Sequence, residues 1–227
     1  MHRRLSALLL ILLLVPATSL LAQSERKPEI SVAYSNLQAQ GLPDKNNSNG
    51  IFGTDFFNNR TTLHGFDAAL TAFPLETFGI TGDFSFNENR RSNDLFRGTN
   101  SIKTDIFYFT AGPTVSFAHS DRLQPFARFL AGGAHTRFDV TSQLSFPAGT
   151  VTNSFKTGTT DFAITAGGGL DWRLNDNLKV RLIQIDYAPV FLRDQSISTL
   201  TAAGALQPFT LNGQRMDNVR FGFGIVF

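Results

Sequence analysis

Three histidines follow the N-terminal segment of this 227-residue chain, and histidine is the side chain best suited to acid–base or metal chemistry near neutral pH. His64, His119 and His135 show none of the spacings typical of metal ligands. His119 and Ser120 are neighbours, but consecutive residues of a strand point to opposite faces, so they do not form a hydrolytic pair. Because the chain also lacks cysteine, we predict no catalytic residue, no metal site and no cofactor.

Charged side chains at regular polar positions form the second candidate set. Each lies on the opposite face of its segment from large apolar residues, and acids and bases are equal in number. An unpaired charge inside a protein costs several kcal/mol, so this balance favours pairing across a narrow interior. We predict a structural network of salt bridges, with a proton or ion relay as the alternative. Its members are Asp67, Asp83, Asp171 and Asp186 with Arg128, Arg173, Arg181 and Arg220.

These residues belong to eight segments in which apolar and polar side chains alternate with the period of a β-strand. The clearest is residues 219–227, where aromatic and aliphatic residues alternate with Arg220 and two glycines. We expect a bulge where the phase changes between Leu182 and Ile183, and a bulge or kink near Pro113, which lacks a backbone donor. The predicted strands lie within residues 30–34, 66–72, 78–86, 107–117, 127–131, 161–174, 178–187 and 219–227.

Very short and long connections alternate between these segments. The short ones, around residues 74–77, 120–122 and 175–177, are typical of tight hairpins. The long ones are rich in Asn, Ser, Thr, Gly and Asp, and we expect them to be loops on one rim. With both ends of the domain on the other rim, this predicts an all-β fold, an eight-stranded antiparallel up-and-down transmembrane β-barrel. The predicted loops cover residues 41–61, 91–103, 141–160 and 193–218.

The N-terminal segment differs from the rest of the chain. Two arginines precede an apolar run over residues 7–15, the pattern of a secretory signal peptide. We predict a signal peptide over residues 1–22, cleaved after Ala22 or alternatively after Ser19, and one barrel domain over residues 23–227. Without those two arginines, the 20 basic residues become 18 and equal the 18 acidic ones, which argues against nucleic acid as a partner. No later segment approaches the roughly 20 apolar residues of a transmembrane helix.

Composition decides which face of the alternating strands points outward. A soluble barrel buries its apolar face and covers its outside with Lys and Glu. Here the predicted strands carry few charges, and the chain holds 23 Phe and 19 Gly. We therefore predict that the Phe-rich face meets acyl chains, while the paired charges lie in an interior that side chains fill.

The eight alternating strands, the alternating turn lengths and the aromatic end of the chain resemble the OmpA-like and OmpX-like family of outer-membrane β-barrels. The resemblance covers about residues 28–227 and implies a bacterial outer membrane, outer-membrane lipid around the barrel, and periplasmic chaperones and the barrel assembly machinery as partners in biogenesis. In this family a terminal aromatic residue preceded by apolar residues at two-residue steps is the assembly signal, which Phe221, Phe223, Ile225 and Phe227 match. OmpA itself continues into a peptidoglycan-binding domain, so the resemblance implies its barrel domain only.

The predicted loops are the expected place of function, because binding residues gather on variable segments held by a rigid scaffold. We predict a structural or surface-binding barrel that is not an enzyme, with a narrow small-solute channel or a lipid-modifying enzyme as alternatives. In the first loop, Phe52, Phe56 and Phe57 are expected to pack on the rim or at the membrane surface. Alternating apolar residues from Ile197 to Leu211 extend the fourth loop as a hairpin, whose edge can pair with a partner strand.

Overall fold

The computed structural model describes residues 26–40, 60–95, 98–117, 122–146, 149–193, 195–200, 206–211 and 215–227. The predicted signal peptide, residues 41–59 of the first loop, and His119 lie outside these ranges. No helix in the described part of the chain is long and apolar enough to cross a membrane. The strands are β1 (Glu29–Gln40), β2 (Arg60–Ala72), β3 (Phe78–Leu95), β4 (Gly98–Ser116), β5 (Leu123–Phe146), β6 (Gly149–Asn175), β7 (Leu178–Tyr187), β8 (Val190–Phe191), β9 (Gln195–Leu200), β10 (Leu206–Leu211), β11 (Arg215–Met216) and β12 (Val219–Val226).

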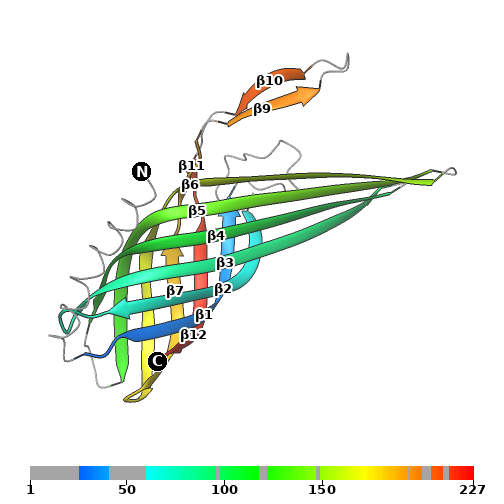
Figure 1. Ribbon diagram of the computed structural model, residues 1–227. Helices are drawn as coiled ribbons and strands as arrows, with labels where there is room; N and C mark the ends of the chain where they lie inside the picture. Colours follow the sequence, from blue (N-terminus) through cyan, green and yellow to red (C-terminus); the bar gives the residue numbers. More distant parts are fainter. Residues whose placement is uncertain are drawn as a thin grey trace, which may run out of the picture.

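Eight of these strands close into a ring with antiparallel neighbours. Strands β1 to β7 pair in chain order, β7 pairs with β12, and β12 closes on β1 (Figure 1). Two backbone hydrogen bonds between Ile30 and Phe227, of 3.0 and 2.8 Å, complete this seam at the chain end. The predicted eight-stranded up-and-down barrel is confirmed. Closure pairs every strand of the wall on both sides, as hydrocarbon surroundings require.

Side chains alternate across the wall as the sequence predicts. On β1, Val32 is 49% exposed, whereas its neighbours Ser31 and Ala33 are 6% and 3% exposed. Every ring strand presents at least one large apolar side chain outward, among them Val32, Leu70, Ile80, Phe109, Phe129, Phe162, Ile185 and Phe223. The Phe-rich face is therefore the outside of the barrel, and the polar face lines its interior.

The predicted bulge in β7 is present. Leu170 of β6 pairs with Ile183, and the next residue, Asp171, pairs with Arg181, so Leu182 is an extra residue on β7. Because of this extra residue, Leu182 and Ile183 are both exposed on the outside. The phase change in the sequence is thus the direct consequence of a bulge.

Of the bulge or kink predicted near Pro113, the bulge is absent. Pro113 pairs with Ile80 of β3, while pairing of β4 with β5 lapses for two residues between Ala111 and Thr114. The register is the same on both sides of the lapse, because each strand skips the same number of residues. Proline removes one ladder donor, and this loss does not require an inserted residue.

Two of the predicted loops are strands. The prediction of loops over residues 91–103 and 141–160 is wrong, since β3 and β4 continue through almost all of the first range and β5 and β6 through the second. Residues 88–105 and 137–160 form a four-stranded extension of the wall beyond the ring (Figure 1). Its Ser, Thr and Asn residues alternate little, because a sheet that meets water needs no continuous apolar face. In the fourth connection, β9 and β10 form the predicted hairpin.

Candidate functional site

Five charged residues from five strands meet inside the barrel and form what we call the charge cluster. Arg128 of β5 donates two hydrogen bonds to Asp186 of β7, of 3.2 and 2.7 Å, and one to Asp83 of β3, of 3.1 Å. Arg220 of β12 contacts the carboxylates of Asp67 on β2, Asp83 and Asp186 at 2.9, 3.3 and 3.0 Å. All five residues are at most 5% exposed. The structure thus joins opposite walls of the barrel through residues that the sequence singled out.

Gln184 links the charge cluster to a second ion pair. Arg181 and Asp171 share two hydrogen bonds, of 2.9 and 3.1 Å. Arg181 also donates to the side-chain oxygen of Gln184 at 2.8 Å, and Gln184 donates to Asp186 at 2.8 Å. The Arg181 guanidinium lies 4.3 Å from the ring centroid of Phe126. Gln184 was not among the predicted network residues because an uncharged amide adds nothing to a charge balance, although its place after the β7 bulge gives it the inward phase.

Arg173 lies apart from this network, which corrects the sequence prediction. Its side chain is exposed, two residues nearer the β6–β7 turn than Asp171, and therefore beyond the packed interior. There it lines an open vestibule of about 810 Å³ at the rim that carries the short turns, hereafter the short-turn rim. Glu29 in this vestibule pairs with Arg26 and Lys179 at 2.6 and 2.5 Å.

Apolar side chains fill the interior on the other side of the charge cluster. They form a plug toward the opposite rim, the loop rim, and each is at most 4% exposed. Alternation did not reveal this apolar plug, because adjacent residues such as Ile106 and Phe107 are both apolar and their faces cannot be told apart. The plug consists of Leu37, Ala39, Leu63, Ile106, Tyr108, Ala134, Ala163, Ala188, Val190 and Met216.

Tyr108 and Asn218 tie the apolar plug together with hydrogen bonds. The Tyr108 hydroxyl donates to the Ala188 carbonyl at 3.0 Å and accepts from the Asn218 side chain at 2.7 Å. The side-chain oxygen of Asn218 accepts a hydrogen bond from the backbone amide of Gln40 at 3.0 Å. The backbone carbonyl of Asn218 accepts one from the backbone amide of Ala188 at 2.8 Å. One buried asparagine therefore connects β1, β4 and the segment between β7 and β8. No sequence pattern marked it.

One of the cavities within the barrel is small and largely polar. Between the charge cluster and the short-turn rim lies a cavity of about 20 Å³, lined by Thr71, Thr81, Thr114 and Arg181 among others. Such a volume holds about one water molecule. The interior is thus polar toward the short-turn rim and closed by the apolar plug toward the loop rim.

A row of aromatic side chains surrounds much of the outer wall near the loop rim, and we call it the aromatic girdle. Ring centroids of Phe86 and Phe107 are 4.8 Å apart, and those of Phe107 and His135 are 6.2 Å apart. Cross-strand pairing places its members side by side from β1 to β5: Tyr34, Phe66, Phe86, Phe107 and His135. Aromatic belts of this kind occur at membrane–water interfaces.

Both described histidines lie on the outer wall at or next to the aromatic girdle. His64 is hydrogen-bonded to the Tyr34 hydroxyl. Nδ1 of His135 lies 2.8 Å from the Thr160 hydroxyl. The sequence analysis assigned neither residue a catalytic role, and these contacts are those of interfacial side chains.

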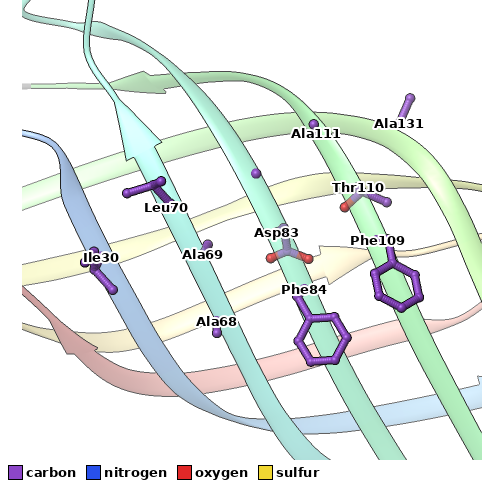
Figure 2. A pocket seen from close by; sticks show the side chains of 11 residues that line it. Ile30, Ala68, Ala69, Leu70, Asp83, Phe84, Phe109, Thr110, Ala111 and Ala131 are labelled. Atoms are coloured by element: carbon purple, nitrogen blue, oxygen red, sulfur yellow. The ribbon is translucent and has the colours of Figure 1, made fainter. Parts of the chain in front are cut away.

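A groove of about 640 Å³ interrupts the outer wall between the aromatic girdle and the short-turn rim (Figure 2). Its floor is a cross-strand row of Gly82, Ala111 and Ala131, whose small side chains leave the backbone nearly bare. Phe84 and Phe109, with ring centroids 5.2 Å apart, form one border. An apolar groove in such a wall suits acyl chains.

Three residues of the predicted assembly signal lie on the outer face of β12, and the fourth, Phe227, directly follows this strand. Phe221, Phe223, Ile225 and Phe227 are 41%, 59%, 44% and 59% exposed. They follow the seam where β12 closes on β1, and Phe227 lies at the short-turn rim. The structure therefore places all four where hydrocarbon meets the wall.

A closed antiparallel ring with an apolar, aromatic-belted outside and an interior filled by side chains defines a transmembrane β-barrel. The sequence identifies the family of barrels to which it belongs. The chain belongs to the outer membrane protein beta-barrel domain family, which matches residues 5–206, and its place is the bacterial outer membrane. The resemblance to OmpA-like and OmpX-like barrels is thereby confirmed.

Solved outer-membrane proteins are similar to this chain at low sequence identity. The attachment invasion locus protein Ail of Yersinia pestis is 17% identical, over 88% of this chain and 97% of that chain, with a TM-score of 0.44. Neisserial surface protein A is 6% identical, over 88% and 95%, with a TM-score of 0.42. The N-terminal barrel domain of Pseudomonas aeruginosa OprF is 12% identical, over 88% and 97%, with a TM-score of 0.33. No curated protein matches the sequence.

Proposed function

We propose that this outer-membrane β-barrel is a surface-binding protein, and that it binds an extended segment of a partner along the free edge of β6. The observation that carries the proposal is the four-stranded extension. Within the described residues, β6 from Val151 to Thr159 pairs only with β5, so its other side offers unpaired backbone donors and acceptors. A peptide that adds a strand there gains main-chain hydrogen bonds, whatever its sequence.

The composition of the two edges favours β6 over β3. The free edge of β3, residues 89–95, holds Arg90, Arg91 and Asp94, and charges of this kind keep other strands away. On β6, residues 149–155 contain no charged side chain, and Lys156 is the first. An uncharged edge of this length supports pairing with a partner rather than protection from it.

The alternatives have less support. Passage of a small solute requires an open lumen, whereas the charge cluster and the apolar plug fill this one. A lipid-modifying hydrolase needs a serine beside a histidine on the outer wall, and the hydrogen-bond partners of the described histidines are Tyr34, Asn36 and Thr160. Binding at the surface is the function that the geometry favours.

Selection of peptides on the protein tests this proposal. A phage-displayed library of random peptides is selected on the full barrel in lipid nanodiscs, and binding is then measured to a variant with a shortened β5–β6 hairpin. In that variant Asn-Gly replaces residues 139–156 and joins Phe138 to its partner Thr157. We expect binding about tenfold weaker or more, because even two lost hydrogen bonds of about 1 kcal/mol each have that effect.

The matched control shortens the other hairpin. Asn-Gly replaces residues 90–103 and joins Asn89 to its partner Thr104, which leaves the β6 edge intact. This variant should bind the selected peptides like the wild type. Equal binding by both shortened proteins, or a library without enriched peptides, contradicts the proposal. Heat-modifiable migration on gels shows that each variant has folded.

For biogenesis, we propose that the barrel assembly machinery reads the outer face of β12, after periplasmic chaperones have carried the unfolded chain. The outward row of Phe221, Phe223, Ile225 and Phe227 supports this reading. A Phe227→Ser variant should then show less folded protein in the outer membrane of cells, yet fold into lipid vesicles as the wild type does. Equal loss in both settings would instead indicate a defect of the barrel itself.

A further inference from the structure

The aromatic girdle marks where hydrocarbon ends on the outer side of the barrel. On β3, β4 and β5 its members are Phe86, Phe107 and His135. A strand rises about 3.3 Å per residue, so positions two and four residues further along lie roughly 7 and 13 Å beyond the girdle, measured along the strand. That distance corresponds to the headgroup layer of a bilayer.

Two cross-strand rows of charged side chains occupy these positions on the outer face. The four-stranded extension continues the lipid-facing side of the wall, so both rows face the same way as the girdle. The first row is Glu88, Asp105 and Arg137, and the second is Arg90, Lys103, Asp139 and Lys156. On β1 and β2 the corresponding positions hold the uncharged pairs Asn36 with His64 and Gln38 with Thr62. These two rows of charge thus do not continue at the same levels onto β1 and β2.

Two of the three acids in these rows are more buried than the bases. The side chains of Asp105 and Asp139 are 7% and 19% exposed, whereas those of Arg137 and Lys156 are 46% and 65% exposed. Arg90 is exposed as well. Glu88 is the exposed acid of the rows, at 50%, and Lys103 is 28% exposed. The surface therefore presents the three exposed cations Arg90, Arg137 and Lys156 beside one exposed acid.

The three acids of the rows contact three of the bases. Lys103 contacts Asp105 at 3.1 Å and Glu88 at 3.3 Å, while Asp139 lies 3.5 Å from Arg137 and 3.7 Å from Lys156. The Asp105 hydrogen bond in particular raises the pKa of the Lys103 ammonium, which is charged at any physiological pH. Exposed ion pairs of this length are weak, so the outer cations keep the capacity to bind a further anion.

We propose that Arg90, Lys103, Arg137 and Lys156 form a basic face that binds the phosphate groups of outer-leaflet lipid. The membrane location of the barrel, the level of the rows above the girdle and the outward cations all point to this ligand. Guanidinium and ammonium groups make charge-assisted hydrogen bonds to phosphate oxygens. Contact with the headgroups on one side also orients the four-stranded extension relative to the membrane surface.

Lipid binding by the full-length barrel tests the basic face. The protein in detergent micelles is titrated with diphosphoryl lipid A and, separately, with the same lipid after removal of its phosphates, and bound lipid is counted by native mass spectrometry. The wild type should prefer the phosphorylated lipid. The double variant Arg90→Gln/Lys156→Gln should bind it roughly 10- to 30-fold more weakly, since two cations near an anionic surface are lost.

A control variant of the same charge change lies on the opposite rim. Lys27 and Arg173 are exposed in the vestibule at the short-turn rim, so Lys27→Gln/Arg173→Gln should leave the affinity for diphosphoryl lipid A unchanged. Equal affinity of the wild type for both lipids overturns the proposal without recourse to any variant. Equal loss in both double variants also overturns it. Tight binding of heparin, with no preference between the two lipids, assigns the basic face to a soluble polyanion instead.

Discussion

Arg128 and Arg220 are the residues on which the interior of this barrel depends. Between them they contact three carboxylates from three other strands. Charges without water around them are costly unless each finds a partner, and removal of one partner leaves the others uncompensated. The charge cluster therefore forms only if all five strands keep the observed register.

Replacement of Arg220 by methionine tests how much the charge cluster contributes to stability. Arg220→Met removes the closest cation of Asp67 and leaves three buried carboxylates with Arg128 alone, so we expect a loss of about 3–5 kcal/mol in the free energy of unfolding. The measurement is urea unfolding in lipid vesicles. The exposed Arg173→Met should change stability by no more than about 0.5 kcal/mol. Similar losses in the two variants would mean that the cluster is not a stabilising unit.

The hydroxyl of Tyr108 offers a second test at this scale. Tyr108→Phe removes a buried group that donates to the Ala188 carbonyl and accepts from Asn218, and it leaves both partners unsatisfied. We expect a loss of about 1–3 kcal/mol in the same unfolding assay. Tyr34→Phe is the matched control, because Tyr34 is exposed on the outer wall. An equal effect of both substitutions would argue against a role for the apolar plug in stability.

The strands differ in what determines their length. Within the membrane, alternation of apolar and polar side chains defines them, and beyond it β3 to β6 persist because each pairs with its neighbours in register. Glycines matter where strands of the wall come close together. A Cβ atom on Gly65 would lie 1.7 Å from the Phe86 carbonyl oxygen, whereas one on Gly82 would meet nothing within 4 Å.

Two alanine substitutions therefore differ in outcome although they lie on paired strands. Gly65→Ala should destabilise the barrel by about 1–3 kcal/mol, because the backbone of β3 must move to admit the methyl group. Gly82→Ala should be neutral or slightly stabilising, because alanine lowers the entropy of the unfolded chain. Urea unfolding in vesicles measures both. Equal stability of the two variants would show that the wall relaxes easily at Gly65.

The molecule as a whole has two unlike ends. Toward the short-turn rim the lumen is polar and opens into the vestibule, whereas toward the loop rim the apolar plug closes it. Outside, the aromatic girdle divides a lipid-facing wall from the charged rows and the four-stranded extension. The barrel is thus a filled anchor that carries a sheet above the membrane.

A filled lumen predicts the electrical behaviour of the protein. Purified barrel inserted into planar bilayers should give no defined single-channel steps, because the apolar plug and the charge cluster lie across the lumen. A porin with an open lumen, studied in the same bilayers, serves as control. Reproducible steps that scale with salt concentration would contradict a permanently filled interior and favour a small-solute channel.

The sequence by itself determined the wall of the barrel. Eight strands and the bulge at Leu182 followed from alternation, since neighbouring positions on a strand point to opposite sides whatever the fold. The scarcity of charges on these strands indicated that the Phe-rich face points outward. The balance of acids and bases likewise indicated an interior network. Alternation is a property of neighbouring residues, and charge balance is a sum over the chain. Both can therefore be obtained from the sequence.

Tertiary structure alone decided which of these residues meet. Arg220 reaches Asp67 and Asp83 across the lumen because of the strand order and register around the ring, and Arg173 is excluded because its position falls beyond the packed interior. A loop was predicted for residues 141–160 because Ser, Thr and Asn occur both in loops and in water-exposed strands. Only pairing with a neighbouring strand distinguishes the two, and pairing is a property of segments far apart in the chain.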